Sequence, residues 1–333
     1  MRVGVAGVGR IGVHHAETLR SLAAVESIVV ADVDAGRAAA TAERLGAEVL
    51  ADPAALFAAG LDALVIAAAT DAHADLLIAA VQAGIPVFCE KPVAPDVDAT
   101  IRAVKEISAH DVPVQIGFQR RFDSGYTAAK AAIAGGRLGW LHTVRATTLD
   151  PAPPPAAYVA SSGGIFRDCG VHDFDIIRWV TGREVEQVYV VGGNQGESFF
   201  LDAGDVDTAA CLLRIEGGTL AVVSLTRYNG AGYDVRLEAL GSAGSISVGL
   251  DDGLPLRSAE AGVAFPAGPA YPGFLERFRD AYTAELAAFV DVAAGRAESA
   301  CTVQDALEAF YIAEACALSL ARGRPVLLAE VRR

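Results

Sequence analysis

A glycine pattern near the amino end restricts the fold of this chain more than any other feature. The apolar run Arg2 to Ala6 leads directly into the sequence GVGRIG at residues 7 to 12, and a segment of helical character follows. Between a strand and a helix, the first glycine of G-x-G-x-x-G allows a tight turn, the second admits a pyrophosphate, and the third lets the helix pack on the strand. Amide groups at the start of the helix would then bind the phosphates. The pattern predicts a dinucleotide site formed by Gly7, Gly9, Arg10, Ile11 and Gly12.

An acidic residue stands where such a site needs one. The apolar run Ser27 to Ala31 ends at Asp32, which lies 20 residues past Gly12 and would accept a hydrogen bond from the adenosine ribose. A 2′-phosphate about 4 Å from this carboxylate would cost roughly 4 kcal/mol at an effective dielectric constant near 20. NAD is therefore expected in preference to NADP. Arg37 leaves NADP open, because a nearby arginine can accommodate that phosphate.

Strand-like and helix-like segments alternate through the first 120 residues. The strands are expected at 2–6, 27–31, 47–51, 63–68, 86–89 and 114–118, and the later helices at 53–59, 71–83 and 95–108. This alternation predicts an α/β domain with a doubly wound parallel sheet, in which ligands bind at the carboxyl ends of the strands. The candidate cofactor residues at those ends, besides the glycine turn and Asp32, are Thr70, His73, Glu90, Lys91 and Gln119.

The second half of the chain has a different pattern. Runs rich in Val, Thr, Leu and Ile, several of them joined by short glycine turns such as 216–218 and 242–244, predict hairpins and a mainly antiparallel sheet. These runs lie at 141–148, 185–191, 207–215, 219–227, 234–240 and 244–248. Residues 251–272 predict a long loop that could cover the site, followed by helices at 274–294 and 302–321. We place the domain boundary so that residues 1–119 form the first domain and 120–333 the second.

The stretch SSGGIFRDCGVHDFDIIRWVTG, residues 161–182, predicts a helix that carries a candidate base. Residues four apart share a helix face, so Asp168 would lie beside His172 and hold its imidazole, as a general base requires. Two other interpretations stay open. The pair could be a surface contact worth a few tenths of a kcal/mol, or it could bind a metal together with Asp175, although no second histidine accompanies it.

Composition limits the possible partners and the compartment. A net charge of −14 argues against binding to nucleic acid or an anionic membrane, since such a chain has no broad excess of positive charge to neutralise phosphates. The five cysteines are scattered without a CxxC pair, which is typical of a reducing compartment. The strand-like run begins directly after Met1, and the apolar runs are too short to span a bilayer. We therefore expect a cytoplasmic protein with no metal site.

Several motifs together resemble the Gfo/Idh/MocA family of oxidoreductases. The glycine turn, Thr70-x-x-His73, Glu90-Lys91-Pro92 and Asp168-x-x-x-His172 occur in the family's order, and the match covers nearly the whole chain. Further segments resemble its inositol 2-dehydrogenase branch, namely 117–123, 150–155, 162–168, 172–175 and 232–234. The resemblance implies a Rossmann domain followed by an α+β domain with an open, mainly antiparallel sheet, through which family members form dimers and tetramers.

The resemblance also implies an activity and a set of roles. It implies NAD-dependent oxidation of a cyclic polyol, myo-inositol to its 2-keto product (scyllo-inosose), with His172 as base, Lys91 stabilising the alkoxide and Asp168 orienting His172. The residues that would contact substrate are Lys91, Arg120, Asp150, Asp168, His172 and Tyr233.

Two alternatives to this activity remain at the level of sequence. Leu149 departs from the arginine that often precedes Asp-Pro in the nearest branch, which leaves a hexose or another inositol isomer open as substrate. A non-catalytic NAD-binding regulator is the other alternative. The presence of Lys91, Asp168 and His172 together argues against it.

Overall fold

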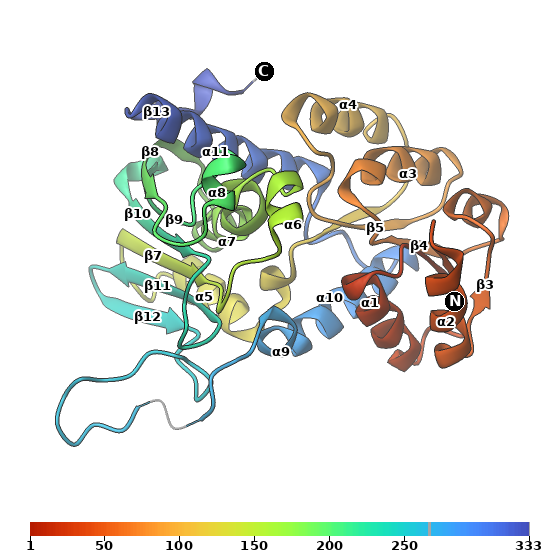
Figure 1. Ribbon diagram of the computed structural model, residues 1–333, viewed down its shortest axis with the longest axis horizontal. Helices are drawn as coiled ribbons and strands as arrows, with labels where there is room; N and C mark the ends of the chain where they lie inside the picture. The colour runs from red at the N-terminus through yellow and green to blue at the C-terminus, as the bar shows by residue number, and fades with distance from the viewer. Residues whose placement is uncertain (266–267, 333) are drawn as a thin grey trace. The chain divides into compact units, whose positions relative to one another are not determined.

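The computed structural model describes residues 1–265 and 268–332 and divides the chain into two compact units (Figure 1). The first contains Met1–Phe122 and Asp280–Leu307, and the second contains Asp123–Arg279 and Glu308–Arg333. The sequence prediction placed 280–307 in the second domain, because a boundary inferred from the order of elements cannot show that a later segment returns to an earlier unit.

A six-stranded parallel sheet forms the centre of the first unit. Its order is β3-β2-β1-β4-β5-β6. The strand order runs outward from β1 to β3 and then continues from β4 on the other side of β1, so the topological switch point lies between β1 and β4. This is the predicted doubly wound sheet. The strands are β1 Arg2–Ala6, β2 Ser27–Ala31, β3 Glu48–Val49, β4 Ala63–Ile66, β5 Val87–Glu90 and β6 Val114–Gly117.

Helices cover both faces of this sheet. Helices α3 (Thr70–Gln82) and α4 (Val97–Ile107) lie on one face, and α1 (Arg10–Ser21), α2 (Ala35–Leu45) and α10 (Arg279–Ala293) lie on the other (Figure 1). The second group packs a core in which Leu19, Phe88 and Phe289 are fully buried, each side chain contributing about 1.5–3 kcal/mol. The predicted helix at 53–59 is a 3-10 helix, Pro53–Ala58, and the one at 274–294 breaks at Phe278 between α9 (Phe274–Arg277) and α10.

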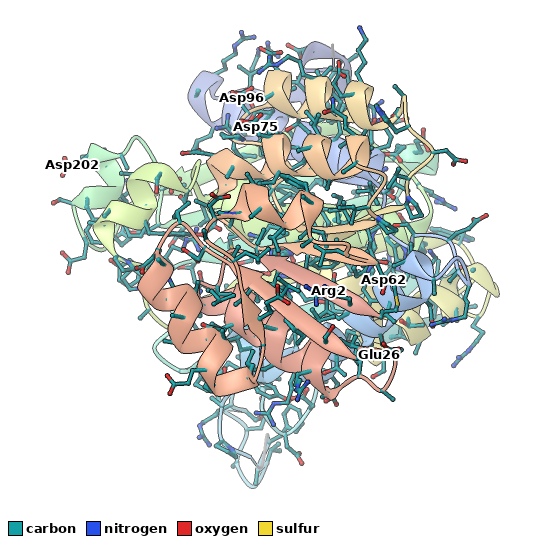
Figure 2. All side chains as sticks on the ribbon, turned by 90° about the vertical axis from the view of Figure 1, so that its right-hand side faces the viewer. Arg2, Glu26, Asp62, Asp75, Asp96 and Asp202 are labelled. Atoms are coloured by element: carbon teal, nitrogen blue, oxygen red, sulfur yellow. The ribbon has the colours of Figure 1, made fainter. Side chains whose placement is uncertain are left out.

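Polar contacts hold the amino ends of the strands. The backbone N–H of Arg2 donates to Asp62 Oδ2 at 2.7 Å, and both residues are labelled in Figure 2. The guanidinium of Arg2 pairs with Glu48 at 2.7 Å. These contacts lie at the amino ends of the strands, and the predicted site residues lie at the opposite, carboxyl ends.

A buried arginine attaches residues 280–307 to the rest of the first unit. Arg121, in the 3-10 helix η2 (Gln119–Phe122), donates to the Ala300 carbonyl at 2.8 Å and pairs with Asp305 at 3.2 Å. Asp305 also accepts hydrogen bonds from the backbone and hydroxyl of Thr302, which cap the start of α11 (Val303–Arg322).

A seven-stranded sheet forms the second unit, in the order β12-β11-β7-β10-β9-β8-β13. The pair β7–β10 is parallel and the other pairs are antiparallel, which confirms the predicted mainly antiparallel sheet and both predicted hairpins. The strands are β7 Leu141–Leu149, β8 Val185–Gly193, β9 Thr208–Ile215, β10 Leu220–Thr226, β11 Asp234–Gly241, β12 Gly244–Val248 and β13 Val326–Leu327.

The remaining helices of the second unit are short, and a loop extends from its sheet. They are α5 (Ser124–Ala134), α6 (Ala156–Ser161), a π-helical turn η3 (Phe166–Gly170), α7 (Val171–Thr181) and α8 (Phe199–Asp202). The described part of the predicted loop 251–272 has no helix or strand (Figure 1), and its residues 266 and 267 lie outside the described residues. Among the described residues, no helix is long and apolar enough to cross a bilayer.

We predict that the Asp305 contacts make stability depend on pH. Burial alone would raise the pKa of Asp305, but the charge of Arg121 and the hydrogen bonds from Thr302 outweigh it and lower the pKa below its ordinary value. A carboxylate with a lowered folded pKa stabilises the fold above its unfolded pKa of about 3.9, and this contribution is lost as pH falls through the folded value. Asp305→Asn should therefore cost about 1–2 kcal/mol at pH 7.

The measurement is the thermal midpoint of wild type and variant across pH. The difference between them should be largest near neutrality and should shrink as pH falls below about 4. A difference of constant size down to the acid limit would contradict this prediction.

Candidate functional site

The glycine turn has the geometry that a dinucleotide requires. Gly7 has φ +89°, in the left-handed region, and a Cβ there would overlap the backbone of Ala68. A Cβ on Gly12 would overlap the Gly7 carbonyl oxygen, so helix and strand approach as closely as backbones can. Nothing lies nearer than 4.0 Å to the Cβ position of Gly9, which leaves space beside the backbone for a pyrophosphate. Arg10 and Ile11 begin α1, whose first amides face this turn.

Asp32 joins the glycine turn to the end of β2. Its carboxylate accepts the N–H of Val8 at 2.7 Å and the N–H of Asp34 at 2.8 Å, and the side chain is almost fully buried. The guanidinium of Arg37 lies 3.6 Å from Oδ1. These contacts hold the carboxylate at the carboxyl edge of the sheet, where the sequence predicted it.

A buried histidine positions the acidic residue that precedes Lys91. His15 of α1 has no solvent exposure, and its Nε2 lies 2.6 Å from Oε1 of Glu90. Glu90 is the last residue of β5, and Lys91 follows it directly at the edge of the sheet. The sequence analysis assigned no partner to Glu90, because sequence spacing does not show that α1 crosses the end of β5.

His73, at the same edge, has backbone carbonyl groups beside both of its ring nitrogens. It lies in α3, which begins at Thr70, and it is buried. One ring nitrogen is 2.7 Å from the Pro92 carbonyl and the other is 3.0 Å from the Ala68 carbonyl. The ring therefore connects the end of β4 to the turn after Lys91, and both of its nitrogens face the protein's own backbone.

The first unit thus places every predicted cofactor residue at one edge of its sheet. Gln119 and Arg120, both buried, start η2 directly after β6 and complete this edge. Parallel strands end together, so the residues that follow β1, β2, β4, β5 and β6 lie along one line.

In the second unit, the predicted helix at 161–182 needs correction. The chain leaves α6 at Ser162, and Gly163 and Gly164 have φ of +80° and +90°, in the left-handed region that ends a helix. Helical structure resumes at Ile165, whose N–H donates to Asp205 at 3.0 Å. The first full turn is π-helical, and regular α-helix begins only at Val171.

Asp168 and His172 therefore occupy different kinds of helix. Asp168 lies in the π turn η3, and His172 is the second residue of α7. Such turns are rare and often mark functional sites. Helix α7 is attached to β7 by a buried hydrogen bond from the Thr148 hydroxyl to Asp173, 2.8 Å long, which fixes the height of His172 above the sheet.

Asp168 contacts two residues that were not among the predicted site residues. The hydroxyl of Tyr158 donates to Oδ1 at 2.8 Å, and Nη2 of Arg227 donates to Oδ2 at 2.7 Å. The other terminal nitrogen of Arg227 donates to Asp150 at 2.7 Å. We call Arg227, Asp150, Asp168 and Tyr158 the Arg227 cluster; it unites two predicted site residues, Asp150 and Asp168.

The charge of Arg227 is fixed by its surroundings. Burial alone would lower its pKa, but Cys169, Asp168 and Asp150 raise the pKa above its ordinary value. Burial raises the pKa of the Cys169 thiol well above its ordinary value, so at neutral pH the thiol is protonated and the negative charges beside Arg227 are the two carboxylates. The cluster is a guanidinium cation shared by two carboxylates.

Tyr233, the remaining predicted substrate residue, lies at the base of the long loop. It is buried, and its N–H donates to the Tyr271 carbonyl at 2.9 Å. The Tyr271 N–H in turn donates to the Gly253 carbonyl at 3.2 Å, which brings the two ends of the loop 251–272 together beside Tyr233.

One of the residues that were not predicted has a signal in the sequence. Arg227 is the last residue of the predicted strand 219–227, the same type of position that indicated the candidates of the first unit. Tyr158 and His15 have no such signal, because their partners lie on other elements. Among the described residues, no cluster of three or more His, Cys, Asp or Glu could hold a metal ion.

The chain matches two sequence models of one family. Residues 1–118 match the oxidoreductase family with an NAD-binding Rossmann fold, and residues 126–247 match the GFO/IDH/MocA C-terminal domain. Myo-inositol 2-dehydrogenase from Thermotoga maritima is 37% identical over 335 residues, which cover 99% of each chain. Inositol 2-dehydrogenase from Rhizobium meliloti is 35% identical and also covers 99% of each chain.

Solved structures agree over the same length. A myo-inositol dehydrogenase from Corynebacterium glutamicum is 35% identical, with a TM-score of 0.91 and 98% of each chain covered. Scyllo-inositol dehydrogenase from Lactobacillus casei, solved with bound NAD(H) and scyllo-inositol, is 28% identical, with a TM-score of 0.88 and 99% of each chain covered.

We predict that Gly12→Ala disables the dinucleotide turn. The added methyl overlaps the Gly7 carbonyl, so α1 must move away and its first amides lose the phosphates. Losing two such hydrogen bonds at about 1.5 kcal/mol each corresponds to roughly 100-fold weaker NADH binding. Gly193→Ala is the control, because nothing lies within 4 Å of its Cβ position. Titration of NADH fluorescence measures both, and equal affinities for the two variants would contradict the prediction.

Proposed function

The chain belongs to the Gfo/Idh/MocA family of NAD-binding oxidoreductases, and from this premise we propose that it oxidises a secondary alcohol of a cyclic polyol, myo-inositol to its 2-keto product scyllo-inosose. The Arg227 cluster is the observation that supports a polyol most directly. Its two carboxylates can accept hydrogen bonds from several hydroxyl groups. Asp150 lies directly after the parallel strand β7, and Asp168 lies in the π turn η3. Relatives across the full length of the chain are inositol dehydrogenases.

The cofactor residues support NAD as the acceptor. The glycine turn has room for a pyrophosphate at Gly9, and Asp32 presents a carboxylate toward the position of the adenosine ribose. Bound NAD supplies the acceptor for the carbinol hydride. We propose that Thr70, Glu90, Lys91 and Gln119 contribute to the same site from the carboxyl edge of the sheet.

The proposed roles follow the chemistry of alcohol oxidation. His172 takes the hydroxyl proton, Asp168 helps to orient it, and Lys91 stabilises the alkoxide that develops as the hydride leaves. Arg120, Asp150 and Tyr233 are proposed to bind the other hydroxyls of the ring. Base catalysis of this kind typically contributes about 10²–10⁴ in rate.

A second substrate is supported by the comparisons. The relatives include a scyllo-inositol 2-dehydrogenase from Bacillus subtilis that is 33% identical over the whole chain. Scyllo-inositol differs from myo-inositol only in the configuration of one hydroxyl, so the same acceptors could bind either ring. Another sugar remains the further alternative, given Leu149.

An exposed apolar patch supports a homo-oligomer formed through the second unit's sheet. Alternate residues of β8, β9 and β10 are exposed, and among them Val191, Leu212 and Leu220 are each more than half exposed. Tyr189 is paired with Leu212 across the sheet on this face. We propose a dimer or tetramer that covers this face.

The thiols support a cytoplasmic location. All five cysteines are buried in the structure. Reduced thiols of this kind are typical of a reducing compartment. We therefore propose that the enzyme works in the cytoplasm.

The test of the activity is initial-rate reduction of NAD by a panel of myo-inositol, scyllo-inositol, D-chiro-inositol, glucose and xylose. We expect turnover with an inositol, and a loss of about 10²–10⁴ in kcat for His172→Ala and of about 10²–10³ for Lys91→Ala. His142→Ala and Lys105→Ala are matched controls, because both side chains are exposed on other elements. No turnover with any member of the panel, while NADH still binds, would reject the proposed substrate class.

We predict that Asp32 sets the preference for NAD. Removing its charge in Asp32→Asn removes a repulsion of roughly 4 kcal/mol at most against the 2′-phosphate of NADP. The ratio of kcat/KM for NAD over NADP should fall at least tenfold, about 1.4 kcal/mol. Asp34→Asn is the control, since Asp34 is exposed and caps α2. An unchanged ratio in Asp32→Asn would contradict the role.

A further inference from the structure

One arginine holds the two carboxylates that the proposed function assigns to the substrate and to the base. Nη1 of Arg227 donates to Asp150 and Nη2 donates to Asp168, both at 2.7 Å. Arg227 has 5% of its surface exposed, so the pairs are shielded from solvent.

The topology of the sheet explains why Arg227 and Asp150 meet. Strands β7 and β10 are parallel, and their last paired residues are Leu149 and Thr226. Asp150 and Arg227 each follow directly, so they leave the sheet at the same edge and side by side. The Asp150 N–H donates to the Thr226 carbonyl at 2.9 Å, which extends the pairing up to the cluster.

The backbone of Arg227 is itself fixed. Its N–H donates to the Asp207 carbonyl at 2.8 Å, and the Asp207 side chain accepts the amides of Gln195 and Gly196 at 2.7 and 2.8 Å. The side chain of Arg227 is therefore anchored to a backbone position that is held by hydrogen bonds at the end of β10. A planar fork with two terminal nitrogens can bind two carboxylates at once, which a lysine ammonium cannot do in the same geometry.

Asp168 is held on both of its oxygens. Arg227 binds Oδ2, and the Tyr158 hydroxyl of α6 binds Oδ1. Asp168 lies in the π turn η3, and these two hydrogen bonds engage both oxygens of its carboxylate. Its orientation therefore depends on these two partners.

We propose that Arg227 is a positioning residue for oxidation of the polyol, which fixes the separation between the carboxylates of Asp150 and Asp168 and thereby the placement of the ring. This inference rests on the proposed function. Arg227 acts through the two carboxylates and not on the substrate itself. A misplacement of about 1 Å at reacting groups can cost roughly 100-fold in rate.

The experiment compares Arg227→Met, Arg227→Lys and a matched control in the full-length protein. The control is Arg178→Met. Arg178 lies near the other end of α7 and donates two partly buried hydrogen bonds to the carboxylate of Glu184, at 2.6 and 2.7 Å, so this variant also loses two ion-pair contacts. For each variant we would measure kcat and KM for inositol, the KM for NAD, the Kd of NADH, and Tm.

We expect Arg227→Met to lower kcat/KM for inositol roughly 100-fold, with the loss in kcat as well as in KM, and to leave NADH binding unchanged. Arg227→Lys should recover part of the loss, because an ammonium can pair with one of the two carboxylates. Arg178→Met should lower Tm as much as Arg227→Met does and keep its activity. Equal activities of Arg227→Met and Arg178→Met at similar Tm would overturn the proposal and leave Arg227 a purely structural residue.

A crystal structure of Arg227→Met makes the test independent of the substrate. Displaced carboxylates of Asp150 and Asp168 support the inference even if wild type oxidises none of the inositols, in which case only the proposed function fails. Carboxylates that keep their positions without Arg227 would overturn the inference whatever the activity.

Discussion

Parallel strands end together, and the candidate residues of each unit depend on that constraint. In the first unit it brings the glycine turn, Asp32 and Lys91 to one edge of a six-stranded sheet. In the second unit a single parallel pair among the described strands, β7 and β10, delivers Asp150 and Arg227 to adjacent positions. An antiparallel partner would have placed Arg227 at the far end of β7. The direction of one strand thus decides whether the Arg227 cluster can form.

Within each unit, specific partners hold the carboxylates near these edges. Backbone amides hold Asp32, a buried histidine holds Glu90, and a guanidinium and a phenol hold Asp168. A buried carboxylate without such partners would cost several kcal/mol. This is how a chain with a net charge of −14 keeps acidic side chains at defined positions.

Much of the fold and a part of the candidate site could be predicted from the sequence. The strands of both sheets except β13 follow from their apolar runs, and the glycine turn follows from its spacing, because these signals are local. The π turn at Asp168 could not be predicted, because the helical spacing of the apolar residues in 161–182 does not distinguish a π turn from a regular α-helix. The return of residues 280–307 to the first unit and the pairing of Arg227 with Asp150 and Asp168 depend on contacts between distant elements. Helix α5 was also missed, because its alanine-rich sequence has no clear apolar stripe.

In the proposed reaction, a ring carbon of myo-inositol transfers its hydride to NAD. Incubation of the enzyme with NAD and myo-inositol deuterated at C2, followed by mass spectrometry of the reduced cofactor, tests this transfer directly. We expect deuterium at C4 of the nicotinamide, with a slower initial rate than for unlabelled substrate. Reduced cofactor without deuterium would show that the hydride comes from another carbon, and no reduced cofactor at all would contradict the oxidation itself.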